Sequence, residues 1–328
     1  MGEKHFETIY EIENLTVEYI LKNLSVKAVN DISIKIRKGE ALGIVGESGS
    51  GKTTLALSLL NLVPPPGRIT SGRIIFDREI DVLSLKSEEL RKFRWKQVAM
   101  VFQGALNSFN PVLRIGDQML ETIKEHGVTS REEGMEKASV LLKLVRLDPE
   151  RTMKAFPHEL SGGMKQRAMI AMSLLLNPRV LILDEPTTAL DVISQKYILD
   201  VLSDLRMKLG ITTVLLTHDL AICAEVVDRI AVTYAGRIVE IAKTEDLFLR
   251  PKHPYSTGLI QATPSVLGDV RKLKPIPGSP PDMFSLPTGC AFNPRCPLAV
   301  DLCRETIPRL EEASEDRFIA CHRWRDLE

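Results

Sequence analysis

The residues with the clearest chemical purpose form one short loop near the start of the chain. Gly46 to Thr53 read G-E-S-G-S-G-K-T, which matches the pattern G-x-x-x-x-G-K-[ST] without a mismatch. Glycines in such a loop let backbone N–H groups close around phosphate oxygens, and the following helix adds positive potential at its N-terminus. The alternative is a tight Gly/Ser turn that merely opens a helix. We set it aside because strand, loop and helix follow in the required order.

This loop predicts a nucleotide site. Lys52 is expected to reach the β- and γ-phosphates, and the Thr53 hydroxyl is expected to bind Mg²⁺. The predicted ATP contacts of the loop are Gly46, Ser48, Gly49, Ser50, Gly51, Lys52, Thr53 and Thr54.

A second group of candidate residues follows the apolar run Val180–Leu183, which ends in Asp184 and Glu185. A buried strand that ends in adjacent carboxylates must solvate them, and a metal ion does so well. Asp184 is expected to hold Mg²⁺, and Glu185 to orient or deprotonate an attacking water. Taken alone, such a strand end is more often the start of a turn. The phosphate loop upstream reverses that preference.

The elements that position these residues alternate between strands and helices. The alternating pattern from about residue 9 to 37 and the apolar run Ala41–Val45 predict strands. Lys52–Leu62 predicts a helix, and buried strands are expected at Val98–Phe102, Val180–Leu183 and Thr212–Leu216. Between residues 103 and 160 the pattern is helical, at Ile115–Glu125 and Glu132–Leu147. We therefore expect an α/β core with a mixed sheet, an antiparallel β subdomain and a helical insertion.

Composition excludes several functional classes. The 328-residue chain has 43 Lys and Arg against 43 Asp and Glu, so it lacks the basic excess typical of nucleic-acid binding. The charged segment Met1–Tyr10 has no signal-peptide core. The longest strongly apolar stretch, Ala168–Leu176, is far shorter than the roughly 20 residues that a membrane helix needs. We expect a soluble or peripheral protein.

The composition changes after Arg250. Prolines recur from residue 251 to 297, a pattern that predicts neither regular helix nor central strand. Four of the five cysteines follow, at Cys290, Cys296, Cys303 and Cys321. In a cytosolic protein such a group indicates a metal centre more often than disulfides. The predicted domains are therefore residues 1–250, with the helical insertion, and an extended, metal-stapled tail at 251–328.

A third motif indicates which family of phosphate-loop proteins the chain resembles. Leu160–Arg167 reads L-S-G-G-M-K-Q-R and closely resembles the signature of ABC ATPases. Asp184 follows Ser161 by 23 residues, a spacing similar to that of the family. The resemblance implies that Ser161, Gly162 and Gly163 bind the γ-phosphate of ATP held by a second subunit. A plain Ser N-cap before a flexible Gly pair is the alternative.

Other positions match family landmarks. Gln103 resembles the glutamine that senses Mg²⁺ and the lytic water, and Asp191 resembles the loop that crosses the dimer interface. His218 resembles the switch histidine on the γ-phosphate, and Tyr19 the aromatic residue that stacks on adenine. The implied catalytic residues are thus Glu185, His218 and Gln103. Elsewhere, a lone Tyr in a strand or a lone His after one is usually structural.

The tail also carries a resemblance. The segments Lys252–Ser256, Gly278–Pro281 and Gly289–Pro297 look like the C-terminal extension of oligopeptide/dipeptide-importer ATPases, whose relatives serve peptides, nickel or sugars. The implied role is an ATPase subunit at the cytoplasmic face of the membrane, bound peripherally. The implied partners are transmembrane permease subunits, a second and different ATP-binding chain and, indirectly, an extracytoplasmic solute-binding protein. The permease is expected to dock near Asn107–Leu113, with Phe109, Pro111, Val112 and Leu113 exposed.

Two other functions compete with transport. A DNA-repair ABC ATPase would carry a long coiled coil between Gly51 and Ser161, but this segment is too short and lacks heptads. A ribosomal member usually carries two ATPase cassettes, and only one phosphate loop occurs here. A purely structural metal-binding protein would leave that loop unexplained. We therefore expect no nucleic-acid partner.

The four tail cysteines leave several chemistries open. Their spacing lacks the close C-x₂₋₄-C pair of most structural zinc sites, whereas four thiolates suit a 4Fe–4S cluster. Some members of the peptide-importer group have a similar arrangement and bind such a cluster. Zinc, disulfides and free thiols remain alternatives, and the expected role is structural. Cys223 stands apart and is expected to be a buried small hydrophobe.

Overall fold

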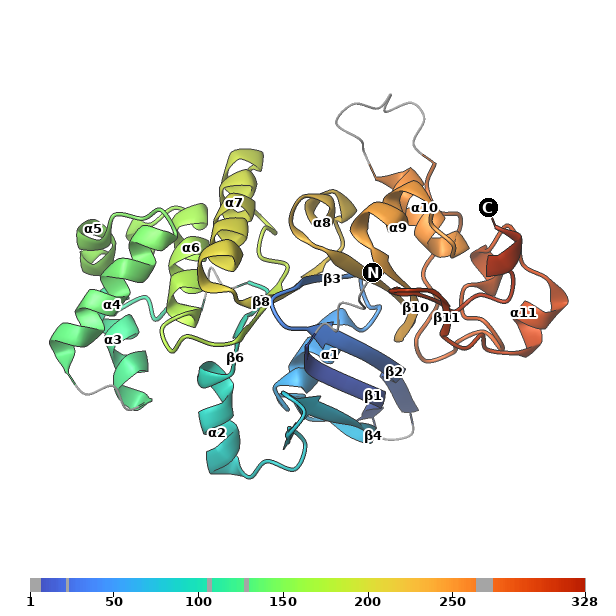
Figure 1. Cartoon of the computed structure of the whole chain (residues 1–328), viewed down its shortest axis with the longest axis horizontal. Helices are drawn as coiled ribbons and strands as arrows, with labels where there is room; N and C mark the ends of the chain where they lie inside the picture. Colours follow the sequence, from blue (N-terminus) through green and yellow to red (C-terminus); the bar gives the residue numbers. More distant parts are fainter. Residues whose placement is uncertain (1–6, 22–23, 105–107, 127–129, 264–273, 328) are drawn as a thin grey trace, which may run out of the picture. The chain divides into compact units, whose positions relative to one another are not determined.

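The structure, a computed structural model, describes residues 7–21, 24–104, 108–126, 130–263 and 274–327. Figure 1 colours their helices and strands along the chain, and they form two compact units. The first unit combines Met1–Ser84 with Leu215–Glu328, and the second is Leu85–Val214. The units do not coincide with the boundary predicted at residue 250, because the tail belongs to the same compact unit as the first strands.

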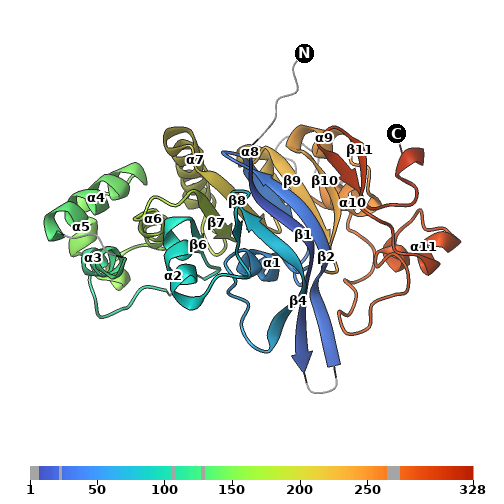
Figure 2. The same ribbon diagram turned by 60° about the horizontal axis from the view of Figure 1, so that its bottom comes forward.

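The first unit contains an antiparallel sheet in the order β2-β1-β4-β5, of which Figure 2 labels β1, β2 and β4. Its strands are β1 (Thr8–Leu21), β2 (Leu24–Arg37), β4 (Gly67–Phe76) and β5 (Ile80–Asp81). Apolar residues alternate along β2, and those that face inward are buried, as Ile32, Ile34 and Ile36 are. Ile34 lies opposite Ile12 of β1, which lies in turn opposite Ile74 of β4. This sheet is the predicted antiparallel subdomain.

Strands of the same unit also lie in the order β11-β12-β10-β9-β3. Their bounds are β3 (Ala41–Val45), β9 (Arg229–Tyr234), β10 (Arg237–Lys243), β11 (Glu311–Ser314) and β12 (Arg317–Ile319). Only β3 and β9 among them pair in parallel, and the other neighbours are antiparallel. The helices of the unit are α1 (Lys52–Leu59), α8 (Leu220–Val226), α9 (Thr244–Leu249), α10 (Pro254–Ala262) and α11 (Asp301–Glu305). Short 3-10 turns are η4 (Asn293–Arg295) and η5 (Trp324–Asp326).

The tail is more regular than its prolines predict. The expectation that residues 251–297 hold no regular helix is wrong, because α10 begins at Pro254. Proline is well tolerated at the first helical position, where its missing N–H would have no helical partner. The His253 imidazole caps this helix by accepting a hydrogen bond from the Tyr255 N–H at 3.0 Å. Further along, β12 pairs with β10, so the tail also supplies strands to a sheet edge.

The second unit holds a parallel pair of strands and a group of helices. The strands are β6 (Val98–Val101) and β7 (Val180–Asp184), paired from Val98 opposite Val180 to Val101 opposite Leu183. The helices are α2 (Ser87–Lys96), α3 (Ile115–Glu125), α4 (Arg131–Leu144), α5 (Pro149–Lys154), α6 (Gly162–Ser173) and α7 (Val192–Leu209), with a 3-10 turn η2 (Pro157–Glu159). The helices α3 to α5 are the predicted insertion. The strand β8 (Thr212–Thr217) crosses the boundary between the units.

Candidate functional site

The phosphate loop connects the fully buried strand β3 to α1. Two of its glycines have no room for a side chain. A Cβ on Gly46 would lie 2.2 Å from the Thr233 carbonyl oxygen, and one on Gly51 would lie 2.0 Å from that of Ala28. Gly51 also has a φ of +96°, a backbone conformation that L-residues rarely adopt. The loop is therefore shaped by close packing on its neighbouring strands.

Lys52 lies inside this loop rather than in solvent. Its side chain is buried, and Nζ donates hydrogen bonds to the carbonyl oxygens of Gly46 (2.7 Å) and Glu47 (3.0 Å). Ser50 is also buried, and its hydroxyl lies 3.0 Å from that of Thr233. An ammonium group held at two carbonyl oxygens of a glycine-rich loop is well placed to meet an anion.

The other predicted residues of the first unit are accessible. Thr53 is exposed and Thr54 is half-buried at the start of α1. His218 is exposed and directly follows β8. Tyr19 is half-buried on β1, where it lies opposite Gly67 of β4. A side chain on Gly67 would approach the Tyr19 ring to 2.9 Å, so this glycine leaves room for the ring.

In the second unit the structure brings Gln103 and Glu185 together. Asp184 ends β7 and is 2% exposed, whereas Glu185 has a φ of +47°. A non-glycine residue in this region stores backbone strain, which is common at functional sites. Gln103 Nε2 donates to Glu185 Oε2 at 3.0 Å, and the Thr188 hydroxyl donates to the same oxygen at 2.9 Å. These donors fix the carboxylate, and Thr188 had escaped the sequence analysis because it belongs to no motif.

The candidate signature residues sit at the start of α6. Ser161 caps this helix, and its hydroxyl accepts a hydrogen bond from the Met164 N–H at 3.3 Å. Gly163 is buried, and a Cβ there would lie 3.0 Å from the Ser194 hydroxyl. Asp191 caps α7 by accepting from the Ser194 N–H (2.9 Å) and hydroxyl (2.7 Å), and these bonds lower the pKa of Asp191. Ser194 therefore contacts both Asp191 and the region of Gly163. No sequence motif predicts this contact.

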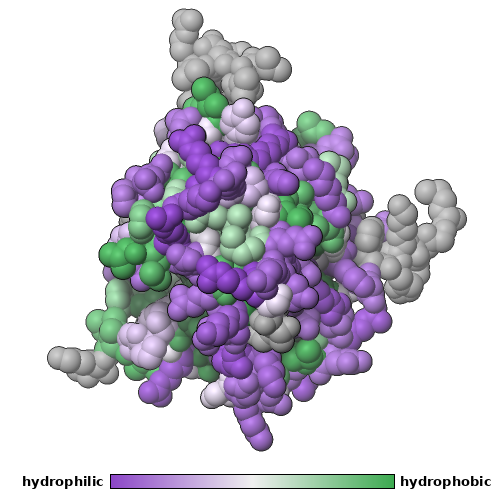
Figure 3. All heavy atoms as spheres, turned by 90° about the vertical axis from the view of Figure 1, so that its left-hand side faces the viewer, coloured by the Kyte–Doolittle hydropathy of each residue, from purple (hydrophilic) through white to green (hydrophobic). Residues whose placement is uncertain are grey.

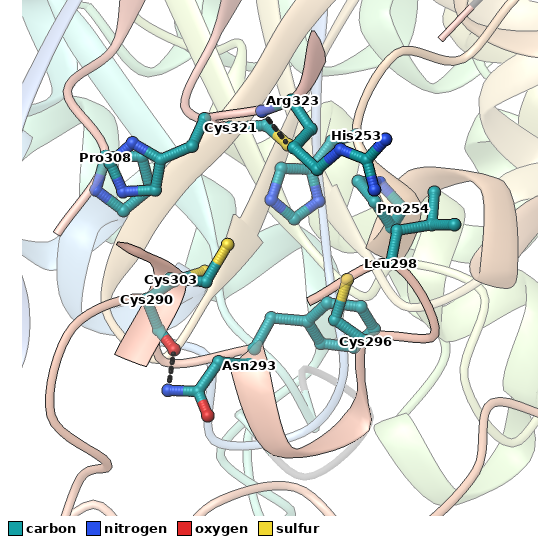
Figure 4. A pocket seen from close by; sticks show the side chains of 12 residues that line it. His253, Pro254, Cys290, Asn293, Cys296, Leu298, Cys303, Pro308, Cys321 and Arg323 are labelled. Carbon is teal, nitrogen blue, oxygen red and sulfur yellow. Dashed lines mark hydrogen bonds between the residues drawn. The ribbon is translucent and has the colours of Figure 1, made fainter. Parts of the chain in front are cut away.

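The four tail cysteines line one small cavity (Figure 4). Cys290 and Cys296 flank η4, Cys303 lies on α11, and Cys321 follows β12. All five cysteines lie in described segments and are free, so the disulfide alternative does not occur here. Burial raises the pKa of Cys290 to about 11 and also raises the pKa values of Cys296 and Cys321. A bound cation would be needed to hold these sulfurs as thiolates at neutral pH.

The arrangement is a partial fit to a metal centre. Four thiols directed to one cavity form the donor set of a Cys₄ site. Over the described ranges, however, no group of three or more His, Cys, Asp or Glu side chains is placed to hold a metal ion. The four sulfurs therefore share a cavity, but they are not arranged as the ligands of a bound metal ion.

Comparisons with known proteins agree with the motifs. Residues 29–188 match the model of the ABC transporter family, and residues 239–303 match the oligopeptide/dipeptide transporter C-terminal region. The dipeptide transport ATP-binding protein DppD of Caldanaerobacter subterraneus subsp. tengcongensis is 43% identical over 97% of this chain and 98% of its own. The oligopeptide transport ATP-binding protein OppD of Escherichia coli is 41% identical over 98% and 95%.

The chain belongs to the ABC transporter ATP-binding family. Among solved structures it resembles a dimeric ATP-binding cassette in a post-hydrolysis state with ADP and Pi, with a TM-score of 0.63 and 32% identity over 72% of this chain and 99% of that one. It also resembles CbiO1 of Clostridium perfringens, with a TM-score of 0.64 and 28% identity over 74% and 91%. The predicted family, mixed α/β fold and ATP hydrolysis are confirmed.

One predicted feature of this ABC subunit needs correction. Phe109 was expected to be exposed with Pro111, Val112 and Leu113, but it is 5% exposed. Val112 is 75% exposed and Leu113 36%, and Pro111 is exposed as well. The aromatic ring thus anchors the segment, whereas its neighbours face solvent. Asn107, the first residue of the predicted docking segment, lies outside the described residues.

The surface around the helical insertion is mixed. On the face that α3 to α5 present, hydrophilic side chains predominate and hydrophobic ones gather in separate patches (Figure 3). Among the described residues, no helix is both long and apolar enough to cross a membrane.

Proposed function

We propose that this ABC ATPase energises the import of oligopeptides or dipeptides, or of related solutes such as nickel or oligosaccharides. The observation that carries this proposal is the match of residues 239–303 to the oligopeptide/dipeptide C-terminal region. The ATP-site motifs occur throughout the ABC family and cannot distinguish solutes, whereas the tail is shared with a narrower group. The near full-length similarity to DppD and OppD supports the same choice.

The roles proposed for the site residues follow from their chemistry. The loop backbone and Lys52 would bind the phosphates of ATP, with Tyr19 against the adenine and His218 at the γ-phosphate. Thr53, Asp184 and Gln103 would hold Mg²⁺, which supplies charge neutralisation on the phosphates. Glu185, oriented by Gln103 and Thr188, would position or deprotonate the attacking water.

The active unit of this proposal is a dimer of ATP-binding subunits. Ser161, Gly162 and Gly163 open α6, where the N-terminal end of a helix favours an anion. They would bind the γ-phosphate of ATP held by a second, related chain, and Asp191 would lie at the interface. Val192 (80% exposed) and Ile193 (72% exposed) follow Asp191 directly. Exposed apolar side chains next to Asp191 favour burial against a partner subunit.

A membrane permease would dock on the segment Asn110–Leu113, which places the ATPase peripherally at the cytoplasmic face. This segment is held by buried Gln118, which accepts from the Asn110 N–H (2.9 Å) and donates to the carbonyl oxygens of Asn110 and Leu113 (3.0 Å each). A fixed backbone that presents exposed Val112 suits a rigid contact with a permease loop. A solute-binding protein would deliver cargo on the opposite side.

The tail cysteines are the proposed ligands of a structural 4Fe–4S cluster. The donors would be Cys290, Cys296, Cys303 and Cys321, and zinc is the less favoured occupant. A cluster spreads its thiolate ligands over several irons, so it does not require the close approach of sulfurs that a single zinc imposes. The support is the shared cavity of four free thiols.

The catalytic part of the proposal is tested with Glu185→Gln in the transporter assembled with its permease. We expect unchanged ATP affinity and a loss of turnover of about 10²–10⁴-fold, because the general base is removed. Glu88→Gln is the matched control, since Glu88 is exposed on α2, where its ion pairs are with its helix neighbours Arg91 and Lys92. Near-normal hydrolysis by Glu185→Gln would remove Glu185 from the role.

A further inference from the structure

The tail contacts the phosphate loop at Glu47. Arg295, in the short turn η4, donates from Nη1 to Glu47 Oε2 at 2.7 Å and from Nη2 to Glu47 Oε1 at 3.0 Å. The Arg295 side chain is 6% exposed and that of Glu47 is 26% exposed. This is a bidentate, largely buried ion pair, the geometry in which an arginine–carboxylate contact is strongest and most directional.

Arg295 is itself held in place. Its Nε donates to the Pro277 carbonyl oxygen at 2.9 Å, and Nη1 also lies 3.3 Å from the Tyr234 hydroxyl. The guanidinium carbon lies 5.8 Å from the centre of the Tyr234 ring and 5.9 Å from that of Phe292. The guanidinium is therefore held by Pro277 and Phe292 of the tail and by Tyr234 of β9, in addition to Glu47, so little conformational freedom is lost when the pair forms.

The backbone of Glu47 is tied as well. Its N–H donates to the Tyr255 hydroxyl at 3.0 Å, and its carbonyl oxygen accepts from Lys52 Nζ at 3.0 Å. Tyr255 is fully buried on α10 and packs on Tyr234, with ring centres 4.5 Å apart. Glu47 thus connects the tail, through its side chain and N–H, to Lys52, through its carbonyl group.

We infer that Arg295 is a positioning residue for the phosphate loop, acting through Glu47 to set the affinity for ATP. The inference rests on the proposed role of this loop in binding phosphates. Arg295 acts in two ways. It holds the loop in one conformation, which lowers the ordering cost of binding. It also neutralises the Glu47 carboxylate, which would otherwise repel the triphosphate of ATP at the neighbouring phosphate loop.

These two effects predict an unusual order of variants. Arg295→Met leaves the Glu47 charge uncompensated, so we expect ATP binding to weaken by roughly tenfold or more. Glu47→Gln combined with Arg295→Met removes the repelling charge and should recover part of that loss. Arg295→Lys keeps the charge but loses the two-pronged contact, so it should lie between wild type and Arg295→Met.

The control is Arg317, a largely buried arginine of the same tail that makes no hydrogen bond to the loop among the described residues. Arg317 donates to Glu240 at 2.9 Å, with side chains 11% and 0% exposed. Arg317→Met should therefore lower thermal stability, because it removes the partner of the buried Glu240 carboxylate, while leaving ATP affinity within about twofold.

The experiment is ATP titration of each purified chain, by calorimetry or a fluorescent ATP analogue, beside nucleotide-free thermal unfolding. Lys52→Ala is included to test the loop itself. Loss of binding in Lys52→Ala with normal binding in Arg295→Met would overturn the inference alone. Normal binding in Lys52→Ala would instead defeat the proposed phosphate site. Equal weakening by Arg295→Met and Arg317→Met would mean general destabilisation and would also overturn it. Should Arg295→Met fail to fold, Arg295→Lys and the double variant decide by the same order.

Discussion

The phosphate loop and the cysteine cavity lie in the same compact unit, yet they are built in opposite ways. The loop is a run of consecutive residues between β3 and α1, and the groups proposed to bind phosphate are mostly its backbone N–H groups. The cavity takes its four thiols from segments spread between residues 290 and 321. The geometry of a backbone site is determined by the spacing of neighbouring residues in the sequence. A site made of side chains from distant segments forms only after those segments have packed together.

The largest effect is expected from Lys52→Ala, which tests the proposed phosphate-binding role of the loop. Lys52 is the one positively charged side chain in Gly46–Thr53, and its buried ammonium group lies against the Gly46 and Glu47 carbonyl groups. Removing a group of this kind costs about 10²–10³-fold in turnover, so we expect hydrolysis to fall by at least that much. The assay is phosphate release by the assembled transporter. Activity within tenfold of wild type would show that the backbone alone suffices.

The cavity half is tested by Cys303→Ser with Cys223→Ser as its control. Cys303 lines the cavity, whereas Cys223 does not. Cys223 is buried beside Gly43, where an added Cβ would lie 3.0 Å from its Sγ atom. This burial strongly raises the pKa of the Cys223 thiol. Both substitutions place a hydroxyl in a buried position, at a cost of about 1–3 kcal/mol. Only Cys303→Ser should lower the iron and sulfide content of protein purified without oxygen.

Two results would contradict the cluster in that experiment. Colourless wild-type protein with one zinc per chain would assign the cavity to a single ion. Equal iron content in both variants would show that the metal, if present, lies elsewhere.

A smaller effect is expected from Thr188→Val, which probes the proposed catalytic carboxylate of Glu185. The Thr188 hydroxyl donates to Glu185 Oε2, an oxygen that Gln103 also holds. Losing one neutral-to-charged hydrogen bond costs about 1.5–3 kcal/mol at most, and the remaining donor limits the loss. Turnover should fall by roughly tenfold with ATP affinity unchanged, as measured by steady-state hydrolysis. A rise in KM alone would assign Thr188 to binding instead.

Sequence reasoning succeeded where the chemistry is local. The loop Gly46–Thr53, the strand that ends in Asp184 and the helix Ile115–Glu125 lie where their patterns place them. The helix after the loop ends at Leu59 rather than Leu62, because the chain turns before the proline run. Such boundary shifts are normal, since helix ends depend on capping contacts that a pattern does not contain.

Sequence reasoning failed where long-range packing decides. The tail prolines concealed α10, because Pro254 occupies the one helical position that suits it. Phe109 was expected on the surface but packs inward. Arg295 and Glu47 are 248 positions apart in the sequence, so no local pattern could predict their ion pair. Thr188 and Ser194 are ordinary hydroxyl residues whose roles depend on the neighbours that folding brings to them.

The central claim, that this subunit uses ATP to drive peptide import, is tested most directly by uptake into proteoliposomes. The assembled transporter would be supplied with its solute-binding protein, ATP and a labelled short peptide, with wild-type or Glu185→Gln chains in parallel. We predict that peptide accumulates only with ATP and wild-type Glu185, and that peptide stimulates hydrolysis. ATP-dependent uptake that persists undiminished in Glu185→Gln, or hydrolysis indifferent to every peptide, dipeptide, nickel and oligosaccharide tested, would contradict the account.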